Sequence, residues 1–275
     1  MKRVFLAFLA ALFCFSSLAK EPASVTVMSF NIRGDENNDG TNSWDFRYAP
    51  VAFMLDDVKP DVVGMQEPSL DQLNFFKDNF SQYKWVGAGR DDGKKQGEYT
   101  CIMYNTKKMS VGKSGTFWLS DSPDKPSAGW DADHACTAVW AVLKEKGSGS
   151  SFFVVNTHID VEGAEFRGKA MELILRKIQE LNTSNLPVVL TGGFNMEDDN
   201  VILAPVKESF QNARAAAFQT DDVRTYHNYG KVSQKIDHIF IKGFSSCTEF
   251  KTITERYADR AYVSDHNPII ATLIL

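Results

Sequence analysis

Residues 188–195 read VVLTGGFN, an apolar run that ends in two glycines, a phenylalanine and an asparagine. A short Val- and Leu-rich run bounded by glycine is typical of a buried β-strand, so Asn195 is expected just beyond a strand end. Sheet-based enzymes build their sites at strand ends. A polar residue next to a buried run recurs along the chain, at Asn31 after 25–30, Glu67 after 62–66, His158 after 152–157, Asp237 after Ile236 and Ser264-Asp265-His266 before 269–275.

Apolar spacing predicts the remaining secondary structure. Helices with one apolar face are predicted over residues 164–181, 48–58 and 70–80, and the segment 83–143 is predicted to form antiparallel hairpins. Helices among many strands indicate layered α/β packing in one domain over residues 20–275. Buried strands are predicted at 25–30, 62–65, 99–104, 139–143, 152–155, 188–190, 236–241 and 269–275.

Composition excludes several classes of protein. The chain has 275 residues, of which 43% are hydrophobic and 12% aromatic, which excludes an intrinsically disordered chain. The 30 basic and 35 acidic residues give a formal net charge of -5. A protein that coats nucleic acid or anionic membrane by bulk attraction needs an excess of cations, which this chain lacks. A phosphate substrate that is held through a metal ion remains compatible with this charge.

Residues 1–19, MKRVFLAFLAALFCFSSLA, have the layout of a secretory signal peptide: two basic residues, an apolar run and a small-residue end at Ala19. The alternatives are a transmembrane anchor and a buried helix. The apolar run is too short to span a bilayer comfortably, so no stable membrane anchor is expected. The protein is predicted to be exported to the periplasm or the extracellular space, with 28 basic and 35 acidic residues after cleavage.

Cleavage would leave three cysteines, Cys101, Cys136 and Cys247, which cannot all pair with one another. Each lies in an apolar stretch, and their spacing is unlike that of a zinc site. Buried thiols are the preferred interpretation, and a disulfide between Cys101 and Cys136 is the alternative.

Six motifs in order resemble the endonuclease/exonuclease/phosphatase superfamily, whose fold is that of deoxyribonuclease I. The resemblance covers the chain from about residue 25 to its end and implies a four-layer α-β-β-α sandwich, in which helices flank two packed, mainly antiparallel sheets. Segments around Trp44, Trp118 and Trp130 also resemble a secreted bacterial branch related to Ccr4-type exonucleases. The motifs are MSFNIR at 28–33, GMQE at 64–67, NTHID at 156–160, TGGFN at 191–195, KIDHIF at 235–240 and SDHNP at 264–268.

The resemblance implies metal-dependent hydrolysis of a phosphate ester. Glu67 would be the principal carboxylate ligand of Mg²⁺, and Asn31 and Asp265 would complete the metal shell directly or through water. Mg²⁺ binds few protein oxygens and keeps several waters, which fits this set, and Mn²⁺ is an alternative. A zinc site is the competing interpretation, since two histidines and two acids are available.

The resemblance also assigns the groups that act on phosphate. His158 and His266 would donate hydrogen bonds to the scissile phosphate, and Asp237 would orient His266 and stabilise its charge. Asn195 would position the phosphate or the attacking water. Donors of this kind are aimed at oxygens on which negative charge develops.

One position departs from the family pattern. The motif that should read TGDFN has Gly193 in place of the aspartate that is the proposed general base. Loss of a positioned base typically costs about 10²–10⁴-fold in rate. The chain is therefore expected to be an impaired hydrolase, a hydrolase in which Glu197, Asp198 or Asp160 substitutes, or a non-catalytic protein that binds a phosphorylated ligand.

The substrate is not fixed by these motifs, because members of one fold act on different phosphate esters. Arg47, Tyr226 and His227 are weak candidates for substrate contacts, and ordinary packing is the alternative for each. The basic segment 90–95 is interpreted as a solvated loop. The expected partner is a phosphate ester, either a small molecule or a nucleic acid, and the protein is expected to act as a monomer.

Overall fold

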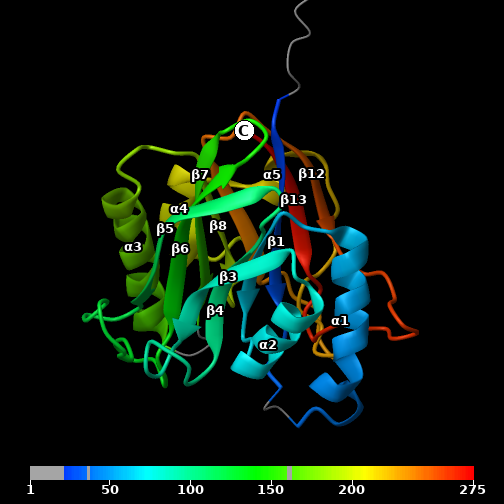
Figure 1. Ribbon diagram of the computed structural model, residues 1–275. Coiled ribbons are helices and arrows are strands. Elements are labelled where there is room, and N and C mark those ends of the chain that lie inside the picture. The colour runs from blue at the N-terminus through cyan, green and yellow to red at the C-terminus, as the bar shows by residue number, and fades with distance from the viewer. Residues whose placement is uncertain (1–21, 36–37, 160–162) are drawn as a thin grey trace, which may run out of the picture.

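The predicted strands assemble into two β-sheets in the computed structural model, which describes residues 22–35, 38–159 and 163–275. Figure 1 shows α3 on one side of the strands and α1 and α2 on the other. The first sheet has seven strands in the order β10-β12-β13-β1-β2-β4-β3, and the second has six in the order β5-β6-β7-β8-β11-β9.

The first sheet joins both ends of the described chain, because β1 pairs with the last strand, β13, antiparallel and with β2 parallel. Its strands are β1 (Ser24–Asn31), β2 (Val62–Gln66), β3 (Tyr83–Gly89), β4 (Tyr99–Asn105), β10 (Ala217–Gln219), β12 (Ser246–Thr252) and β13 (Ile269–Ile274).

The second sheet contains a parallel pair, β7 with β8, between antiparallel neighbours. Its strands are β5 (Met109–Trp118), β6 (Thr137–Glu145), β7 (Ser151–His158), β8 (Val188–Gly193), β9 (Gln211–Asn212) and β11 (Asp237–Lys242).

Side-chain alternation along the strands creates the layers. In β7, Phe152 and Val154 enter the core between the sheets, whereas Phe153 and Val155 pack on the helical side. Long helices cover both outer faces: α1 (Trp44–Val58) and α2 (Leu70–Asn79) on the first sheet, and α3 (Ala164–Leu181) on the second. The shorter helices are η1 (Gly40–Asn42), η2 (Val201–Leu203), α4 (Ala204–Ser209) and α5 (Ala213–Ala216).

This architecture confirms the predicted sandwich of two mainly antiparallel sheets flanked by helices. The helix over 164–181 has the predicted bounds, whereas the first long helix begins earlier, at Trp44. All three cysteines of the described chain are buried thiols, so the alternative disulfide does not form. The predicted signal peptide lies outside the described residues. No helix within the described ranges is long and apolar enough to cross a membrane.

A polar cluster joins the two sheets beneath the ends of β1, β2, β7 and β8. Asn156 accepts hydrogen bonds from Gln66 Nε2 (2.7 Å) and Thr191 Oγ1 (3.0 Å), and its own amide donates to the carbonyls of Met65 and Cys101 (both 2.9 Å). The sheets approach closely here because Gly64 has no side chain: a Cβ would lie 2.6 Å from Asn156 Oδ1 and nearer still to Thr191 Oγ1. Glycine is therefore required at this position.

Substitution of Gly64 tests this close approach. Gly64→Ala is expected to lower the free energy of unfolding by about 2–4 kcal/mol, because the methyl group must displace a hydrogen-bonded buried amide. The matched control is Gly168→Ala in α3, where a Cβ meets nothing within 4 Å. That change is expected to raise stability by about 0.5–1 kcal/mol. Urea unfolding measures both, and equal effects would contradict the interpretation.

Candidate active site

Three neighbouring strands of the second sheet bring His158, Gly193 and Asp237 into one row. His158 at the end of β7 is in register with Gly193 at the end of β8, and Gly193 is in register with Asp237 at the start of β11. In the first sheet, Asn31 is in register with Gln66, so Glu67 follows directly beside Asn31. The strand ends therefore bring together residues that lie far apart in the sequence.

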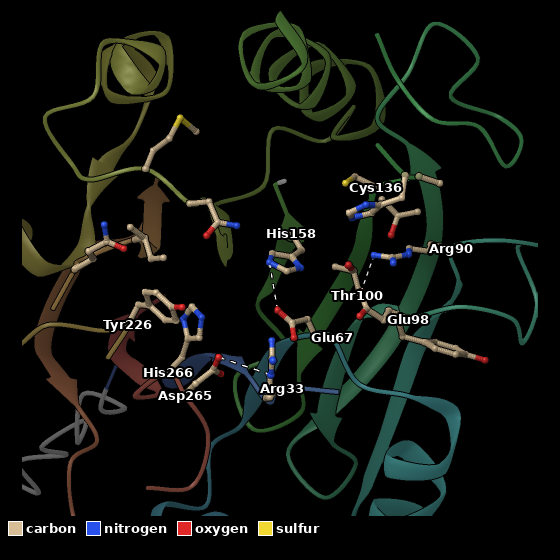
Figure 2. Close-up of a pocket in the computed structure, with 18 of the residues that line it drawn as sticks. Arg33, Glu67, Arg90, Glu98, Thr100, Cys136, His158, Tyr226, Asp265 and His266 are labelled. Carbon is tan, nitrogen blue, oxygen red and sulfur yellow. Dashed lines mark hydrogen bonds and ion pairs between the residues drawn. The ribbon is translucent and has the colours of Figure 1, made fainter. Parts of the chain in front are cut away.

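A cleft of about 620 Å³ opens above these strand ends. Figure 2 shows Glu67 and His158 facing each other on its floor, with Asp265 and Arg33 to one side of Glu67. Asn31 and Asp237 do not line the cleft, but each hydrogen-bonds to a residue that does. The predicted site residues that line it are Glu67, His158, Asn195, Tyr226, Asp265 and His266.

Glu67 is held as a carboxylate at the centre of the floor. Asn31 Nδ2 donates to its Oε1 at 2.6 Å, and His158 Nε2 lies 3.7 Å from the same oxygen. Burial opposes ionisation of Glu67, but the nearby imidazole and the amide donor hold its pKa below the ordinary range. Its φ of 64° lies in the left-handed region, which a non-glycine residue adopts at a cost.

His266 and Asp237 form a buried ion pair. The ring Nδ1 of His266 lies 2.8 Å from Asp237 Oδ2, and Tyr226 packs against the ring with centroids 4.6 Å apart. Burial would lower the pKa of His266, but the attraction of Asp237 outweighs it and raises this pKa to about 9. The imidazole is therefore a cation and a hydrogen-bond donor at neutral pH.

Asp265 and Arg33 form the side of the floor near Glu67. Burial raises the pKa of Asp265, and repulsion from Glu67 raises it further. Arg33 Nε lies 3.8 Å from Asp265 Oδ2, but the guanidinium is held mainly by Asp39, at 3.0 and 3.2 Å. Glu67 and Asp265 thus share one region, and each has a basic group at some distance, His158 at 3.7 Å and Arg33 at 3.8 Å.

Asn195 completes the floor on the side of the second sheet. Its Nδ2 donates to the carbonyl of Ile159 at 2.7 Å, and its φ is 52°. Glu67, Arg33 and Asn195 all line the cleft and all have positive φ. Strained backbone of this kind clusters at sites of function.

Comparison with known proteins now identifies the family. Residues 28–266 match the model of the Endonuclease/Exonuclease/phosphatase family. The chain belongs to this family. A family member from Bacteroides vulgatus of known structure is 35% identical, with a TM-score of 0.87, over 92% of this chain and 99% of that one.

Other proteins are also similar to this chain. The mannosyl-6-phosphatase of Bacteroides thetaiotaomicron is 32% identical, with a TM-score of 0.86, over 91% of this chain and 100% of that one. Protein L388 of Acanthamoeba polyphaga mimivirus is 25% identical over 249 residues, covering 82% of this chain and 91% of the viral protein. The zebrafish (D. rerio) TDP2 structure with single-stranded DNA, 18% identical with a TM-score of 0.73, shares the fold.

Gly193 ends β8 between His158 and Asp237, where a Cβ would be 3.1 Å from His158 Cδ2 and 3.4 Å from Asp237 Oδ1. Two of the acids named as possible substitutes for the missing base have partners of their own. Asp198 accepts from Lys207 and Asn212, and Glu197 accepts from the Lys235 amide and pairs with Arg224, although it lines the cleft. Asp160 lies outside the described residues.

Two predicted substrate contacts are corrected by their positions. Arg47 is 2% exposed and lies outside the cleft lining, with its guanidinium directed at backbone carbonyls. His227 also lies outside the lining, and its ring stacks on Tyr262 at 4.4 Å. Both side chains therefore support the loops around the cleft. Tyr226, the third candidate, does line it.

Two basic residues that line the cleft were not predicted as site residues from the sequence. Arg33 belongs to the motif MSFNIR and was not singled out. Arg90, which was interpreted as part of a solvated loop, lines the far wall, where its Nη1 lies 2.6 Å from Glu98 Oε2 (Figure 2). Arg90 directly follows β3, a strand that the sequence pattern did not separate from the predicted hairpin segment 83–143.

Arg47 provides a test of the corrected role. Arg47→Met is expected to lower the free energy of unfolding by about 3–5 kcal/mol, because the carbonyls of Ile32, Arg33, Asn42 and Val263 lose their donor. The control is Arg176→Met on the exposed face of α3, expected to change stability by less than about 0.5 kcal/mol. Urea unfolding measures the free energy of unfolding of both variants. An Arg47→Met protein as stable as the parent would contradict the structural role of Arg47.

Proposed function

We propose that the protein is a metal-dependent phosphoester hydrolase whose reaction takes place above Glu67. The observation that carries the proposal is the pairing, on one cleft floor, of two carboxylates with two imidazoles, one of them held as a cation. The carboxylates suit a hard metal ion, and the imidazoles suit the oxygens of a phosphate. Family membership supports the same class of reaction.

The donor set fits Mg²⁺, with Mn²⁺ as the alternative. Glu67 and Asp265 supply carboxylate oxygens, Asn31 can supply its amide oxygen, and repulsion between the two acids would be relieved by a divalent cation. Zinc is the weaker alternative, because the proposed ligands are all oxygen donors, which suit Mg²⁺ better. When bound, the ion neutralises phosphate charge and polarises the phosphoryl group.

The remaining residues act on the phosphate. His266 donates from its cationic ring to a phosphoryl oxygen, and Asp237 keeps it protonated. His158 donates from the opposite side of Glu67, where its ring lines the cleft. Asn195, fixed by its bond to Ile159, positions the phosphate on the second-sheet side.

The charge of the cleft favours a small substrate over a polynucleotide. A polyanion requires a basic track, but the lining carries five carboxylates against two guanidiniums and the His266 imidazolium. Thr100, Thr137, Asn200 and Gln234 add neutral hydrogen-bonding groups that suit hydroxyls. These groups suit a phosphomonoester with a hydroxyl-rich leaving group. The similarity to a mannosyl-6-phosphatase supports this choice of substrate.

A second function is favoured by one observation, the absence of a carboxylate at Gly193. The metal-binding acids and the two histidines do not depend on that position. The same site would then capture a phosphorylated ligand without turnover. Metal binding with no hydrolysis would support this alternative.

We also propose that the protein acts outside the cytoplasm. The amino-terminal segment, with its basic start, apolar run and small residues before Lys20, supports export. A mature amino terminus at Lys20 in protein recovered from the producing cell would agree with this proposal.

Removal of the metal or of its main ligand tests the proposed hydrolase. A panel of phosphomonoesters and phosphodiesters is expected to be hydrolysed with Mg²⁺ and not with EDTA. Glu67→Gln is expected to reduce turnover on the order of 10²-fold or more, because a neutral amide holds a divalent cation weakly. Glu165→Gln, which removes only an exposed pair with Lys169, is the control. Calorimetry should show weaker Mg²⁺ binding in Glu67→Gln alone, and EDTA-resistant turnover would contradict the proposal.

The choice of substrate is tested by direct competition between classes. Mannose 6-phosphate is expected to be hydrolysed with at least about tenfold higher kcat/KM than a single-stranded oligonucleotide, because the acidic cleft repels a polyanion. Gel shifts with the oligonucleotide at low salt are expected to show no stable complex. Tight, salt-sensitive binding or faster cleavage of the oligonucleotide would instead make a nucleic acid the substrate.

A further inference from the structure

Arg90 and Glu98 form an ion pair on the wall of the cleft that lies away from His266. Arg90 directly follows β3 and Glu98 directly precedes β4, and the amide of Arg90 donates to the carbonyl of Glu98 at 3.1 Å. Their side chains meet at 2.6 Å, between Nη1 and Oε2, and remain 22% and 31% exposed. Both residues line the cleft, so the pair is accessible to a ligand there.

The loop between β3 and β4 holds this pair in place. Asp92 Oδ1 accepts hydrogen bonds from three backbone amides of the loop, at 2.7 to 3.0 Å. The indole of Trp118 donates to the carbonyl of Arg90 at 2.7 Å. The loop also packs directly on the strand end, since a Cβ on Gly89 would lie 2.2 Å from the carbonyl oxygen of Gln96. The segment is therefore a built wall of the cleft and not a solvated loop.

The sheet register places the pair within reach of a ligand bound at Glu67. Strand β4 lies between β2 and β3, with Gln66 opposite Thr100 and Thr100 opposite Ala88. Neighbouring strands are about 5 Å apart, so the backbones at Glu67 and Arg90 are separated by roughly two spacings, about 10 Å. Figure 2 shows the side chain of Arg90 reaching from the wall toward the middle of the cleft. One small molecule can therefore contact both places.

The charge of the pair selects the chemistry of that contact. Glu98 neutralises Arg90, and the other carboxylates of the lining disfavour a second anionic group on the substrate. A guanidinium has five N–H donors, of which the bond to Glu98 uses a single nitrogen, and a carboxylate has several acceptor positions. A donor and an acceptor side by side match two adjacent hydroxyls, each of which can both accept and donate.

We propose that Arg90 and Glu98 are specificity-determining residues that bind two adjacent hydroxyls of a sugar whose phosphate lies above Glu67. The guanidinium donates to one hydroxyl oxygen, and the carboxylate accepts from the other hydroxyl. This inference rests on the proposed function and deepens it, because it assigns sugar recognition to one ion pair. A sugar phosphate is then held at both ends, which orients its ester bond in the cleft.

The first test compares two substrates of similar shape that differ in their hydroxyls. Mannose 6-phosphate and cyclohexylmethyl phosphate both carry a primary phosphate on a six-membered ring, but the second has no hydroxyl. The parent is expected to favour the sugar at least about 100-fold in kcat/KM, because the analogue leaves polar groups without partners. Arg90→Met and Glu98→Gln are each expected to lower this ratio about tenfold or more.

The matched control is Arg176→Met on α3, which removes an exposed guanidinium near Glu180, outside the cleft lining. Its substrate ratio is expected to stay within about twofold of the parent value. Thermal unfolding checks that each variant is folded. A pair that only supports the wall affects both substrates alike, so the ratio separates recognition from support.

The second test measures binding without turnover. Calorimetry with Mg²⁺ gives the Kd values of mannose 6-phosphate and of inorganic phosphate for the parent, Arg90→Met and Glu98→Gln. The preference for the sugar phosphate over inorganic phosphate is expected to fall about tenfold in each variant, because only the sugar reaches the pair. This readout also decides the inference if the protein binds its ligand and does not hydrolyse it.

The outcomes separate the inference from the function on which it rests. A parent that hydrolyses both substrates equally well, or folded variants that keep the parent ratios in both tests, would overturn the role of Arg90 and Glu98 and leave the proposed hydrolase intact. A parent that neither hydrolyses nor binds any of these phosphates contradicts the proposed function itself.

Discussion

The amide of Asn156 is the contact on which the position of the site depends. It joins the two sheets by hydrogen bonds to Gln66, Thr191 and two backbone carbonyls, all in the dry space between them. An amide so enclosed tolerates little displacement, because each lost bond leaves a buried polar group unpaired. Glu67, His158 and Gly193 follow this cluster within two residues along their strands, so the cluster fixes the distance between the sheets at the cleft floor.

Because the strand ends at the floor of the cleft are fixed in this way, residues there can adopt backbone φ angles that an isolated chain avoids. Glu67 and Asn195 have positive φ at the exits of β2 and β8, and Arg33 has positive φ beyond β1. Each costs of order 1–3 kcal/mol and persists only because the surrounding structure determines it. The paired strands before these residues and the buried core behind them supply that support. The strain turns each chain sharply at the strand end, so that the side chain enters the cleft.

Much of the fold and part of the site could be predicted from the sequence. Period-two and period-3.6 patterns are local, so the helix over 164–181 was found with both of its bounds and the strand over 188–190 with its start, although the strand continues to Gly193. The strand-end rule located Glu67, His158 and His266 because a buried run marks where a strand stops. Arg47 and Arg90 could not be assigned in this way, since the same guanidinium satisfies interior carbonyls in one place and lines a cleft in the other. That choice depends on tertiary neighbours, which no local pattern contains.

The site has two parts, one around Glu67 and one around His266, and neither depends on a side chain at position 193. At one end, Asn31 and His158 maintain Glu67 as a carboxylate; at the other, Asp237 maintains His266 as a cation. Neither pair contacts a side chain at position 193, because there is none. The groups proposed for metal and phosphate binding therefore keep their partners without any side chain at this position. The two proposed functions, hydrolysis and capture of a phosphate ester, therefore make the same demands on both pairs.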